Sequence, residues 1–411
     1  IDGHDLPTLI GILSEARDFP RPMVLHVKTV KGKGFAFSEA DASKFHSPPA
    51  FEFDTPEEGE PAERACRVEL KSEGRSFTSA FSDAMLALLS RDPKVVACTA
   101  AMPDGTGLTK SLAAHPDRVW DTGICESHAL DMMAGLAKTG FRPFFAVYST
   151  FFQRAFDQAF QEASLQGLAV RLCLDRAGLV GGDGAVHHGF CDVAILRTLP
   201  KVALMAAMDE ASLKACLAFM ADYNDGLSSV RYPRDAVSPM YADQACPPFE
   251  LGKARALITH ERPDIALLGF GTMAIEASEA AKALGEEYAV NVYDARFAKP
   301  VDHELIRCLL ARRLPIVTVE DHSLVGGFGA AVLEAAQLMG LDASRVVRLG
   351  LPDSWIIQDA RSKQLAEAGI DASGIARAIR HAVELAISDH DASRPDLHVA
   401  VRPMTSSGVT T

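Results

Sequence analysis

The fold is indicated by one continuous stretch, residues 142–175, with the sequence RPFFAVYSTFFQRAFDQAFQEASLQGLAVRLCLD. It starts with an apolar run, RPFFAVY, of the kind found in buried strands, and it ends with a second such run, LAVRLCLD. The segment between them, FFQRAFDQAFQEASLQ, has apolar residues at helical spacing. A strand, a helix and a strand in succession predict two parallel strands joined by a crossover helix.

The same alternation extends in both directions from this stretch. Further strand-like runs are VVACTA, RVW, KVALMA and LSSVRY and, beyond a break at residues 238–252, DIALLGF, AVNVYDA, LPIVTVED and RVVRLGL. Helical patterns such as AIEASEAAKAL and GFGAAVLEAAQLM lie between them. The sequence therefore predicts an α/β protein with two doubly wound domains, at residues 76–240 and 248–388, whose sheets are parallel and covered on both faces.

Residues 1–75 differ from this pattern. They contain a predicted helix from Asp5 to Arg17, a predicted strand from Met23 to Thr29 and the glycine-rich turn KGKGF, and residues 37–75 are acidic and rich in proline, as in a linker. We interpret residues 1–75 as the end of a third α/β domain, and we expect the chain to be a piece of a longer polypeptide. Residues 389–411 are predicted to form a polar tail.

Composition restricts the possible functions. The 411 residues are 48% hydrophobic with a net charge of −13, which argues against a nucleic-acid surface, because such a surface needs clustered basic residues. No apolar run approaches the ~20 residues that span a bilayer. The eight cysteines are scattered singly, which favours reduced thiols in a cytoplasmic protein over disulfides or zinc.

A carboxylate stands at the start of an apolar helix in GICESHAL, residues 123–130. Glu126 precedes a largely apolar segment, residues 128–139, where burying a charge is costly unless a partner compensates it. The simple interpretation is an acidic residue in the first helical turn, which the helix dipole stabilises by ~0.3–1 kcal/mol. The alternative is that a ligand is the partner.

Polar residues also follow the predicted strand that ends at Asp175. The segment DRAGLVGGDGAVHHG, residues 175–189, places Arg176, Asp183 and His187 at the carboxyl end of that strand, where open α/β sheets bind ligands. Tyr148 and Phe151 begin the neighbouring strand-to-helix turn.

A further strand-like run ends in VRYPRD, which offers Arg231 and Arg234 to a phosphate. GGDG alone does not predict a metal site, because the only asparagines, Asn224 and Asn291, lie too far from Asp183 along the chain.

These segments together resemble the 1-deoxy-D-xylulose-5-phosphate synthases, thiamine diphosphate enzymes of the transketolase superfamily. The resemblance extends over about residues 1–390 and rests on IDGHDL, HVKTVKGKGF, AAMPDGTGL, GICESHALDMMAGLA, AVYSTFFQRAFDQ, DRAGLVGGDGAVHHG, VRYPR, ARFAKPVD and VEDHSLVGGFG. The family has three α/β domains, and this chain resembles the end of the first followed by the second and third.

The resemblance implies that Glu126 hydrogen-bonds a ring nitrogen of the aminopyrimidine of thiamine diphosphate. Such a bond promotes loss of the proton from the reactive thiazolium carbon. By the same resemblance, Phe151 packs on the aminopyrimidine and Phe35 contacts the cofactor. The Mg²⁺ that binds the diphosphate is expected to have its ligands in the missing part of the first domain.

Further implied residues form the acceptor and phosphate site. Tyr148, Asp183 and His187 are expected to be catalytic, with His187 as proton carrier, and the substrate-binding residues are expected to be Arg176, Arg234 and His46. The implied reaction joins pyruvate to glyceraldehyde 3-phosphate with loss of CO2, at the start of isoprenoid, thiamine and pyridoxal precursor synthesis. A cytoplasmic homodimer is implied, inactive without the missing domain.

Two departures and three alternatives remain. Ser127 replaces the family's usual Gln, and Ala185 and Val186 replace a Pro and a hydroxyl residue. The alternatives are the β subunit of a 2-oxo-acid dehydrogenase, half of a transketolase, and a non-catalytic dimerising protein. The KGKGF segment and the pair QRAFDQ and DRAGLVGGDG favour the synthase interpretation.

Overall fold

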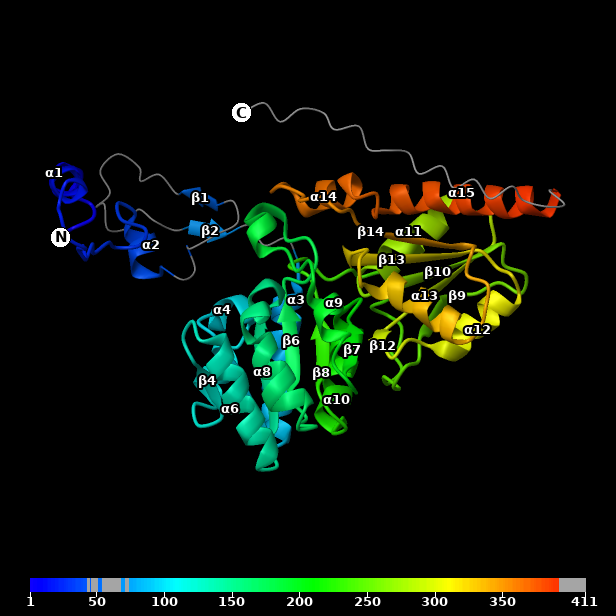
Figure 1. The fold of residues 1–411 in the computed structure, drawn as a ribbon, viewed down its shortest axis with the longest axis horizontal. Coiled ribbons are helices and arrows are strands. Elements are labelled where there is room, and N and C mark those ends of the chain that lie inside the picture. Colours follow the sequence, from blue (N-terminus) through cyan, green and yellow to red (C-terminus); the bar gives the residue numbers. More distant parts are fainter. Residues whose placement is uncertain (43–44, 46–50, 54–67, 71–73, 392–411) are drawn as a thin grey trace. The chain divides into compact units, whose positions relative to one another are not determined.

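The structure is a computed structural model that describes residues 1–42, 45, 51–53, 68–70 and 74–391. Two compact units make up the chain, Ile1–Arg75 and Ser76–Thr411. The larger unit contains a seven-stranded and a five-stranded sheet, both visible in Figure 1. Helices lie on the faces of both sheets, so the predicted α/β class with two sheet domains is confirmed.

The smaller unit is built from short elements. Helix α1 (Leu6–Arg17) begins after Asp5, whose carboxylate accepts a hydrogen bond from the Thr8 amide, and α2 is Ala36–Ala40. Strands β1 (Phe51–Phe53) and β2 (Val68–Leu70) pair antiparallel. The predicted strand from Met23 to Thr29 is wrong, because within the described residues this backbone has only an isolated bridge, between Asp2 and Lys28.

The seven-stranded sheet has the order β12-β7-β8-β6-β5-β3-β4. Its strands are β3 (Val95–Thr99), β4 (Val119–Asp121), β5 (Arg142–Tyr148), β6 (Arg171–Asp175), β7 (Ala203–Ala206), β8 (Ser228–Arg231) and β12 (Phe297–Lys299). All pairs are parallel except that of β12 with β7. The all-parallel prediction fails there because β12 is a three-residue strand from the second half of the chain, too short to show a periodic pattern.

Helices cover both faces of this sheet. In β5, Phe144 and Phe145 point to opposite faces, the first toward a core shared with α3 (Phe77–Arg91) and α10 (Glu210–Asp222). The second faces a core shared with α6 (Glu126–Lys138) and α9 (Asp192–Leu196). Short helices α4 (Pro103–Thr106) and α5 (Thr109–Ala114) join β3 to β4.

The predicted helix after β5 is broken into four pieces. They are α7 (Ser149–Phe152), the 3-10 turn η2 (Gln153–Ala155), α8 (Phe156–Gln158) and the π-helical η3 (Ala159–Ser164). Short π-helical segments of this kind occur frequently at functional sites. The apolar spacing predicts the buried face but not the change of helix type.

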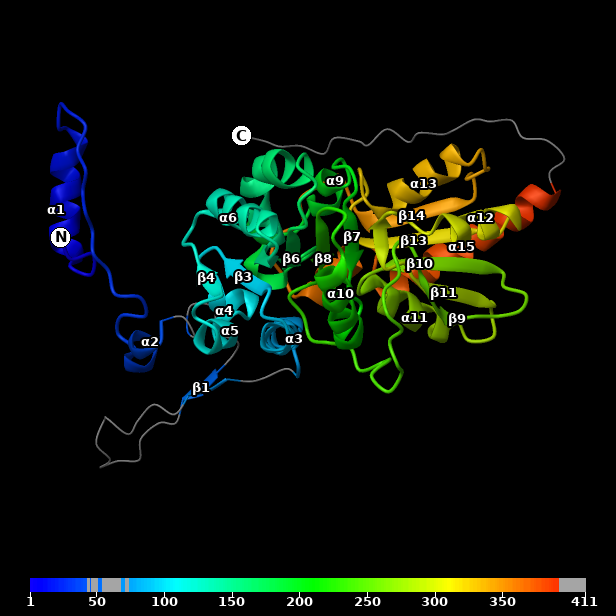
Figure 2. The ribbon, with the colours of Figure 1, turned by 90° about the horizontal axis from the view of Figure 1, so that it is seen from below.

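The five-stranded sheet has the order β14-β13-β10-β11-β9. Its strands are β9 (Arg255–Ile258), β10 (Ile265–Phe270), β11 (Val290–Asp294), β13 (Ile316–Ser323) and β14 (Val346–Leu351). Only β9 is antiparallel, so the all-parallel prediction is wrong for this edge strand as well. Helices α11 (Met273–Leu284) and α15 (Ala372–Asp391) cover one face, and α12 (His303–Ala311) and α13 (Phe328–Leu338) cover the other, as Figures 1 and 2 show. The remaining helix is α14 (Arg361–Glu367). Helix α15 includes residues 389–391 of the predicted tail, and residues 392–411 lie outside the described part.

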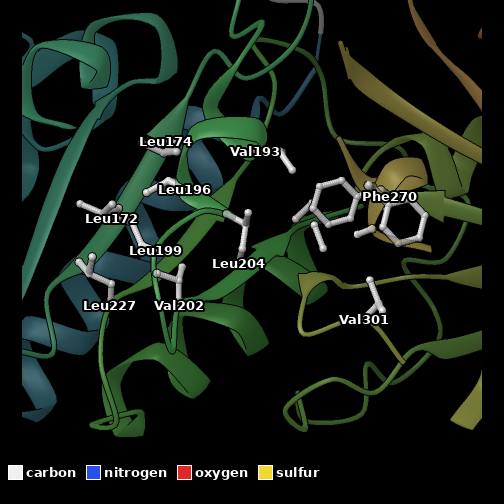
Figure 3. Packing of buried hydrophobic residues seen from close by; sticks show 14 of the residues in the cluster. Leu172, Leu174, Val193, Leu196, Leu199, Val202, Leu204, Leu227, Phe270 and Val301 are labelled. Carbon is white, nitrogen blue, oxygen red and sulfur yellow. The ribbon is translucent and has the colours of Figure 1, made fainter. Parts of the chain in front are cut away.

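One hydrophobic cluster joins the two sheet domains. Figure 3 shows Val193 and Leu204 of the first domain beside Phe270 and Val301 of the second. Because the cluster is continuous, the two sheets share a core. Among the described residues, no helix is both long enough and apolar enough to cross a bilayer.

The cysteines that the structure describes are all unpaired. Cys98, Cys173 and Cys216 are buried in the sheet domains, as expected of reduced thiols, whereas Cys125 and Cys308 are exposed. Cys66 lies outside the described residues.

Candidate active site

The carboxyl ends of the central parallel strands bring the predicted site residues to one edge of the seven-stranded sheet. In the register of β5 with β6, Tyr148 lies opposite Asp175. In the register of β6 with β8, Leu174 lies opposite Arg231. Residues that follow these strands, such as Phe151, Arg176 and Arg234, therefore leave the sheet at the same edge, where open α/β folds place their ligands.

Glu126 is the first residue of α6, directly after the N-cap residue Cys125. Only 3% of Glu126 is exposed, which confirms the prediction of a charge at the start of an apolar helix. Its Oε1 accepts a hydrogen bond from Arg154 Nη1 at 2.6 Å. The hydrogen bond and ion pair of this carboxylate with Arg154 involve Oε1 and not Oε2, so Oε2 is available to a ligand.

Arg154 is a site residue that the sequence did not single out. It lies in η2, in the break of the helix after β5. Its guanidinium lies 4.8 Å from the centroid of the Phe151 ring, so one cation contacts both Glu126 and Phe151. The segment QRAFDQ was a recognisable signal, but a contact between residues 28 apart is not visible in local spacing.

Ser127 holds Arg154 in place. Its hydroxyl donates a hydrogen bond to the backbone carbonyl of Arg154 at 2.7 Å. The departure from the family's usual glutamine therefore leaves a polar contact between the start of α6 and the segment that carries Arg154.

A row of rings extends from Phe151, beside Arg154, in two directions: to Tyr148 and to the loop that follows β6. Tyr148 and Phe151 stack with centroids 5.8 Å apart, and Phe151 meets the His187 ring edge to face at 5.5 Å. Burial raises the pKa of the Tyr148 hydroxyl, which therefore stays protonated at neutral pH. The structure thus brings together three residues that lie up to 39 positions apart in the sequence.

Arg176 lies at the other end of this row, 4.0 Å from the centroid of the Tyr148 ring. Its Nη1 donates to the carbonyl of Gly105 at 2.6 Å and to Asp175 Oδ2 at 2.8 Å. Its side chain is only 11% exposed. Burial raises the pKa of Asp175, and Arg176 opposes that rise. Much of the Arg176 guanidinium is therefore engaged within the protein.

His187 and Asp183 lie in the loop that follows β6. His187 Nδ1 lies 3.2 Å from the carbonyl oxygen of Asp183. Because a carbonyl can only accept, Nδ1 carries the proton, which leaves Nε2 as the acceptor of the neutral ring. The Asp183 carboxylate forms an ion pair with Arg234, whose side chain is 36% exposed.

Arg231 and Arg234 have different environments. Arg231 is 4% exposed, its Nε donates to Asp192 at 2.9 Å, and its Nη2 donates to the carbonyl of Asp321 at 3.0 Å. The suggestion that a phosphate uses Arg231 is wrong, because Asp192 already satisfies this buried guanidinium. Arg234 is the arginine of VRYPRD with an accessible side chain.

Two predicted residues lie elsewhere in the chain. Phe35 belongs to the smaller unit, where it precedes α2, is 53% exposed and contacts Phe37. His46 lies outside the described residues. Across the described ranges, no group of three or more His, Cys, Asp or Glu side chains is placed to hold a metal ion.

Comparisons with known proteins match two domains. Residues 73–239 match the family model described as the transketolase pyrimidine binding domain, and residues 254–375 match the transketolase C-terminal domain. The chain is 42% identical to 1-deoxy-D-xylulose-5-phosphate synthase 1 of Geobacter sulfurreducens, over 92% of this chain and 58% of that protein. It is 40% identical to 1-deoxy-D-xylulose-5-phosphate synthase of Symbiobacterium thermophilum, over 92% of this chain and 56% of that protein. The chain thus spans little more than half the length of these relatives.

Solved structures share the fold. A split gene transketolase, described as an inactive beta4 tetramer, superposes with a TM-score of 0.65 at 29% identity, over 76% of this chain and 99% of that chain. Transketolase from Leishmania mexicana superposes with a TM-score of 0.63 at 17% identity, over 77% of this chain and 46% of that chain. The second similarity concerns the fold alone.

Proposed function

Because the chain belongs to the transketolase family, whose pyrimidine-binding and C-terminal domains it carries, we propose that it provides these domains of a 1-deoxy-D-xylulose-5-phosphate synthase. The proposed reaction joins pyruvate to glyceraldehyde 3-phosphate with loss of CO2. The name shared by relatives at 40–42% identity supports this proposal. The observation that carries it is the buried Glu126 carboxylate, with Arg154 on one oxygen and the other available.

The cofactor implied by these domains is thiamine diphosphate, which supplies an electron sink for the decarboxylation of a 2-oxo acid. Glu126 is proposed to hold a proton between Oε2 and the aminopyrimidine ring. Its buried position strengthens such a bond, because a hydrogen bond to a charged group contributes about 1.5–3 kcal/mol. Arg154 keeps the carboxylate in a single orientation, and Phe151 provides an apolar surface for the pyrimidine ring.

The acceptor site is proposed to lie along the ring row and the loop after β6. Arg234 binds the phosphate of glyceraldehyde 3-phosphate, and Asp183 orients the guanidinium until the phosphate arrives. His187 exchanges a proton at Nε2 with the substrate oxygen, since Nδ1 is occupied by the Asp183 carbonyl. Tyr148, whose hydroxyl stays protonated, donates a hydrogen bond to the same substrate.

The remaining roles are carried over from the resemblance. Phe35 is proposed to contact the cofactor, and His46 and Arg176 to contact substrate. For Arg176 the role is confined to the part of the guanidinium that Gly105 and Asp175 leave free. We further propose that the enzyme is a homodimer in the cytoplasm, where buried thiols such as Cys98 and Cys173 stay reduced.

Mg²⁺ and the diphosphate are proposed to bind a separate diphosphate-binding domain. Two observations support this. The chain spans 58% of its relative from Geobacter sulfurreducens, and helix α1 of the smaller unit has no buried residue, as expected of an element that packs against something else. The domain could belong to the same polypeptide or to a second chain.

A second candidate is the corresponding half of a two-chain transketolase. The split gene transketolase supports it, because this chain covers 99% of the chain in that structure. The two candidates differ in the donor. A transketolase takes its two carbons from a ketose phosphate and releases no CO2.

The test is to combine the chain with a diphosphate-binding domain, taken from the synthase of Geobacter sulfurreducens, and to supply thiamine diphosphate and Mg²⁺. We expect CO2 release from labelled pyruvate that depends on glyceraldehyde 3-phosphate. Turnover with a ketose phosphate and none with pyruvate would support the transketolase candidate. Inactivity with both donors, despite a stable complex, would support a non-catalytic protein.

A further inference from the structure

The loop that carries Asp183 and His187 is closed at its base. Gly178 N donates to the carbonyl of Gly189 at 3.0 Å, and Gly189 N donates to the carbonyl of Gly178 at 2.8 Å. Both positions need glycine. A Cβ on Gly189 would lie 2.6 Å from Ala177 Cα, and one on Gly178 would lie 2.2 Å from the Asp321 carboxylate. Residues 178–189, termed here the acceptor loop, are thus a compact loop with paired ends, a form that is frequently functional.

Gln364, on helix α14 of the C-terminal domain, pairs with Gly181 in the first half of this loop. Its Oε1 accepts from Gly181 N at 2.9 Å, and its Nε2 donates to the carbonyl of Gly181 at 3.2 Å and to that of Ile357 at 2.8 Å. The side chain is fully buried, at 0% exposure. The amide side chain of Gln364 therefore satisfies both the N–H and the carbonyl of Gly181, as the backbone of a neighbouring strand would.

Arg361 lies three residues earlier on α14 and therefore on the same side of the helix. Its Nε donates to the carbonyl of Leu179 at 3.0 Å, and Nη1 and Nη2 pair with Asp235 at 2.6 Å and Asp321 at 2.7 Å. Asp235 directly follows Arg234. One guanidinium thus ties the acceptor loop to the segment that carries the proposed phosphate ligand.

His188 adds a third connection between the loop and the C-terminal domain. Its Nδ1 accepts from Val180 N at 3.3 Å, so Nε2 carries the proton and donates to the carbonyl of Ile356 at 3.0 Å. The ring is 3% exposed. The adjacent His187 has no comparable contact with the C-terminal domain among the described residues. The two adjacent histidines therefore differ in their contacts. His188 connects the loop to the C-terminal domain, and His187 packs against Phe151.

We propose that helix α14 sets the geometry of the acceptor loop, with Gln364 and Arg361 as positioning residues for Asp183, His187 and Arg234. The acceptor site would then depend on both sheet domains of this chain, although the proposed catalytic groups all lie in the pyrimidine-binding domain. This inference rests on the proposed function, which assigns Asp183 and His187 of the loop to the acceptor site. The connection itself rests on the hydrogen bonds of buried groups.

The first test measures hydrogen exchange in residues 1–411. Gln364→Met removes both bonds to Gly181 with little change of volume, and Gln337→Met, at an exposed position on α13, is the matched control. Loss of bonds to a buried backbone should speed exchange in peptides within 178–189 by about tenfold or more, with β5 and β10 unchanged. Equal exchange in the two variants would overturn the proposed connection.

The second test measures kinetics in the complex with a diphosphate-binding domain. Gln364→Met should raise KM for glyceraldehyde 3-phosphate about tenfold and leave KM for pyruvate and the affinity for thiamine diphosphate unchanged. Arg361→Lys keeps the charge beside Asp321 but loses the planar guanidinium that bonds three partners, so it should also raise KM for glyceraldehyde 3-phosphate. Equal effects on both substrates, or none, would show that α14 has only a structural role.

The two proposals fail in distinguishable ways. If the unsubstituted complex has no activity with pyruvate and glyceraldehyde 3-phosphate, the proposed function fails, and the exchange result still decides whether α14 holds the loop. If the complex is active but Gln364→Met matches Gln337→Met in both tests, only the positioning inference fails.

Discussion

The two units of the chain use the same kind of amphipathic helix with different results. In α6 of the larger unit, Ala129, Leu130, Met133 and Ala134 are buried. In α1 of the smaller unit no residue is buried, and Ile10 and Leu13 are 63% and 51% exposed. Helical spacing therefore predicts which side of a helix is apolar, but not whether the chain supplies what covers that side.

The same contrast applies to the residues that the family resemblance identifies. Glu126 is held by Arg154, and Arg154 by Ser127, all within one compact unit. Phe35 lies in a unit whose larger apolar side chains, within residues 1–42, are mostly exposed. The larger unit thus holds its candidate site residues by contacts within the unit, whereas Phe35 lies on an exposed part of the smaller unit.

The largest expected effect is on enzymatic activity, and it compares a substitution in the larger unit with one in the smaller unit. In the complex with a diphosphate-binding domain, Glu126→Gln should lower kcat by about 10²–10⁴-fold, because glutamine cannot take part in proton transfer. Phe35→Leu should mainly weaken cofactor binding. Glu279→Gln, at an exposed site on α11, is the control for loss of a charge. Near-normal decarboxylation of pyruvate by Glu126→Gln, with an unchanged Tm, would contradict the role of Glu126.

Stability gives the next comparison. Phe145 is 0% exposed in the core of the first sheet, so Phe145→Ala should lower the free energy of unfolding of the larger unit by about 3–5 kcal/mol. Ile10→Ala lies in the smaller unit and should change the free energy of unfolding of that unit by less than about 0.5 kcal/mol. Denaturant unfolding of residues 1–411 measures both. A loss of several kcal/mol for Ile10→Ala would show that α1 is covered after all.

A third prediction examines the proposed acceptor site, in the larger unit. Arg234→Ala should raise KM for glyceraldehyde 3-phosphate about 10- to 150-fold, because a charge-assisted contact of about 1.5–3 kcal/mol is lost. KM for pyruvate should barely change, and Arg262→Ala, at an exposed position, should change neither. An equal rise for both substrates would show that Arg234 has a structural role.

The smallest expected effect concerns pH and the buried residues at the carboxyl end of β13. Burial lowers the pKa of His322 from 6.5 to about 4, and burial raises the pKa of Glu320 from 4.5 to about 7. Between pH 4.5 and 6.5, unfolding adds a proton at the histidine and releases one at the glutamate. The two contributions oppose each other, so this pair should add little net pH dependence to the stability of the wild-type chain in this range.

Single substitutions should reveal the two opposing slopes. In Glu320→Gln only the histidine remains, and stability should fall as pH falls, by up to about 1.4 kcal/mol per pH unit. In His322→Gln only the glutamate remains, and stability should rise as pH falls. His381→Gln, at an exposed site on α15, is the control. Slopes of the same sign in the two variants would contradict this account. Denaturant unfolding of the three variants at three pH values between 4.5 and 6.5 measures these slopes.

The sequence predicted most of the fold because most elements show a clear period. Apolar runs such as DIALLGF and RPFFAVY became β10 and β5, since strands buried on both faces are continuously apolar. Met23 to Thr29 shows the limit of this reasoning. It has strand-like residues but, within the described part, no strand beside it. The antiparallel edge strand β12 depends on a partner from the other half of the chain.

The site could be predicted only as far as local sequence carries it. Glu126, Asp183 and His187 stand in recognisable segments, and the strand ends indicated a common edge. The contacts that hold them join distant positions. Arg154 and Glu126 are 28 residues apart, and Gln364 and Gly181 are 183 apart. Such pairs depend on how the elements pack, which a single sequence does not show.

The most direct test of the account is calorimetry of thiamine diphosphate with residues 1–411, in the presence and absence of Mg²⁺. If the chain supplies the pyrimidine half-site without the diphosphate half, binding should be weak and nearly independent of Mg²⁺, and a diphosphate-binding domain should make it tight and Mg²⁺-dependent. Tight, Mg²⁺-dependent binding by residues 1–411 alone would contradict the account, because the metal site would then lie within this chain.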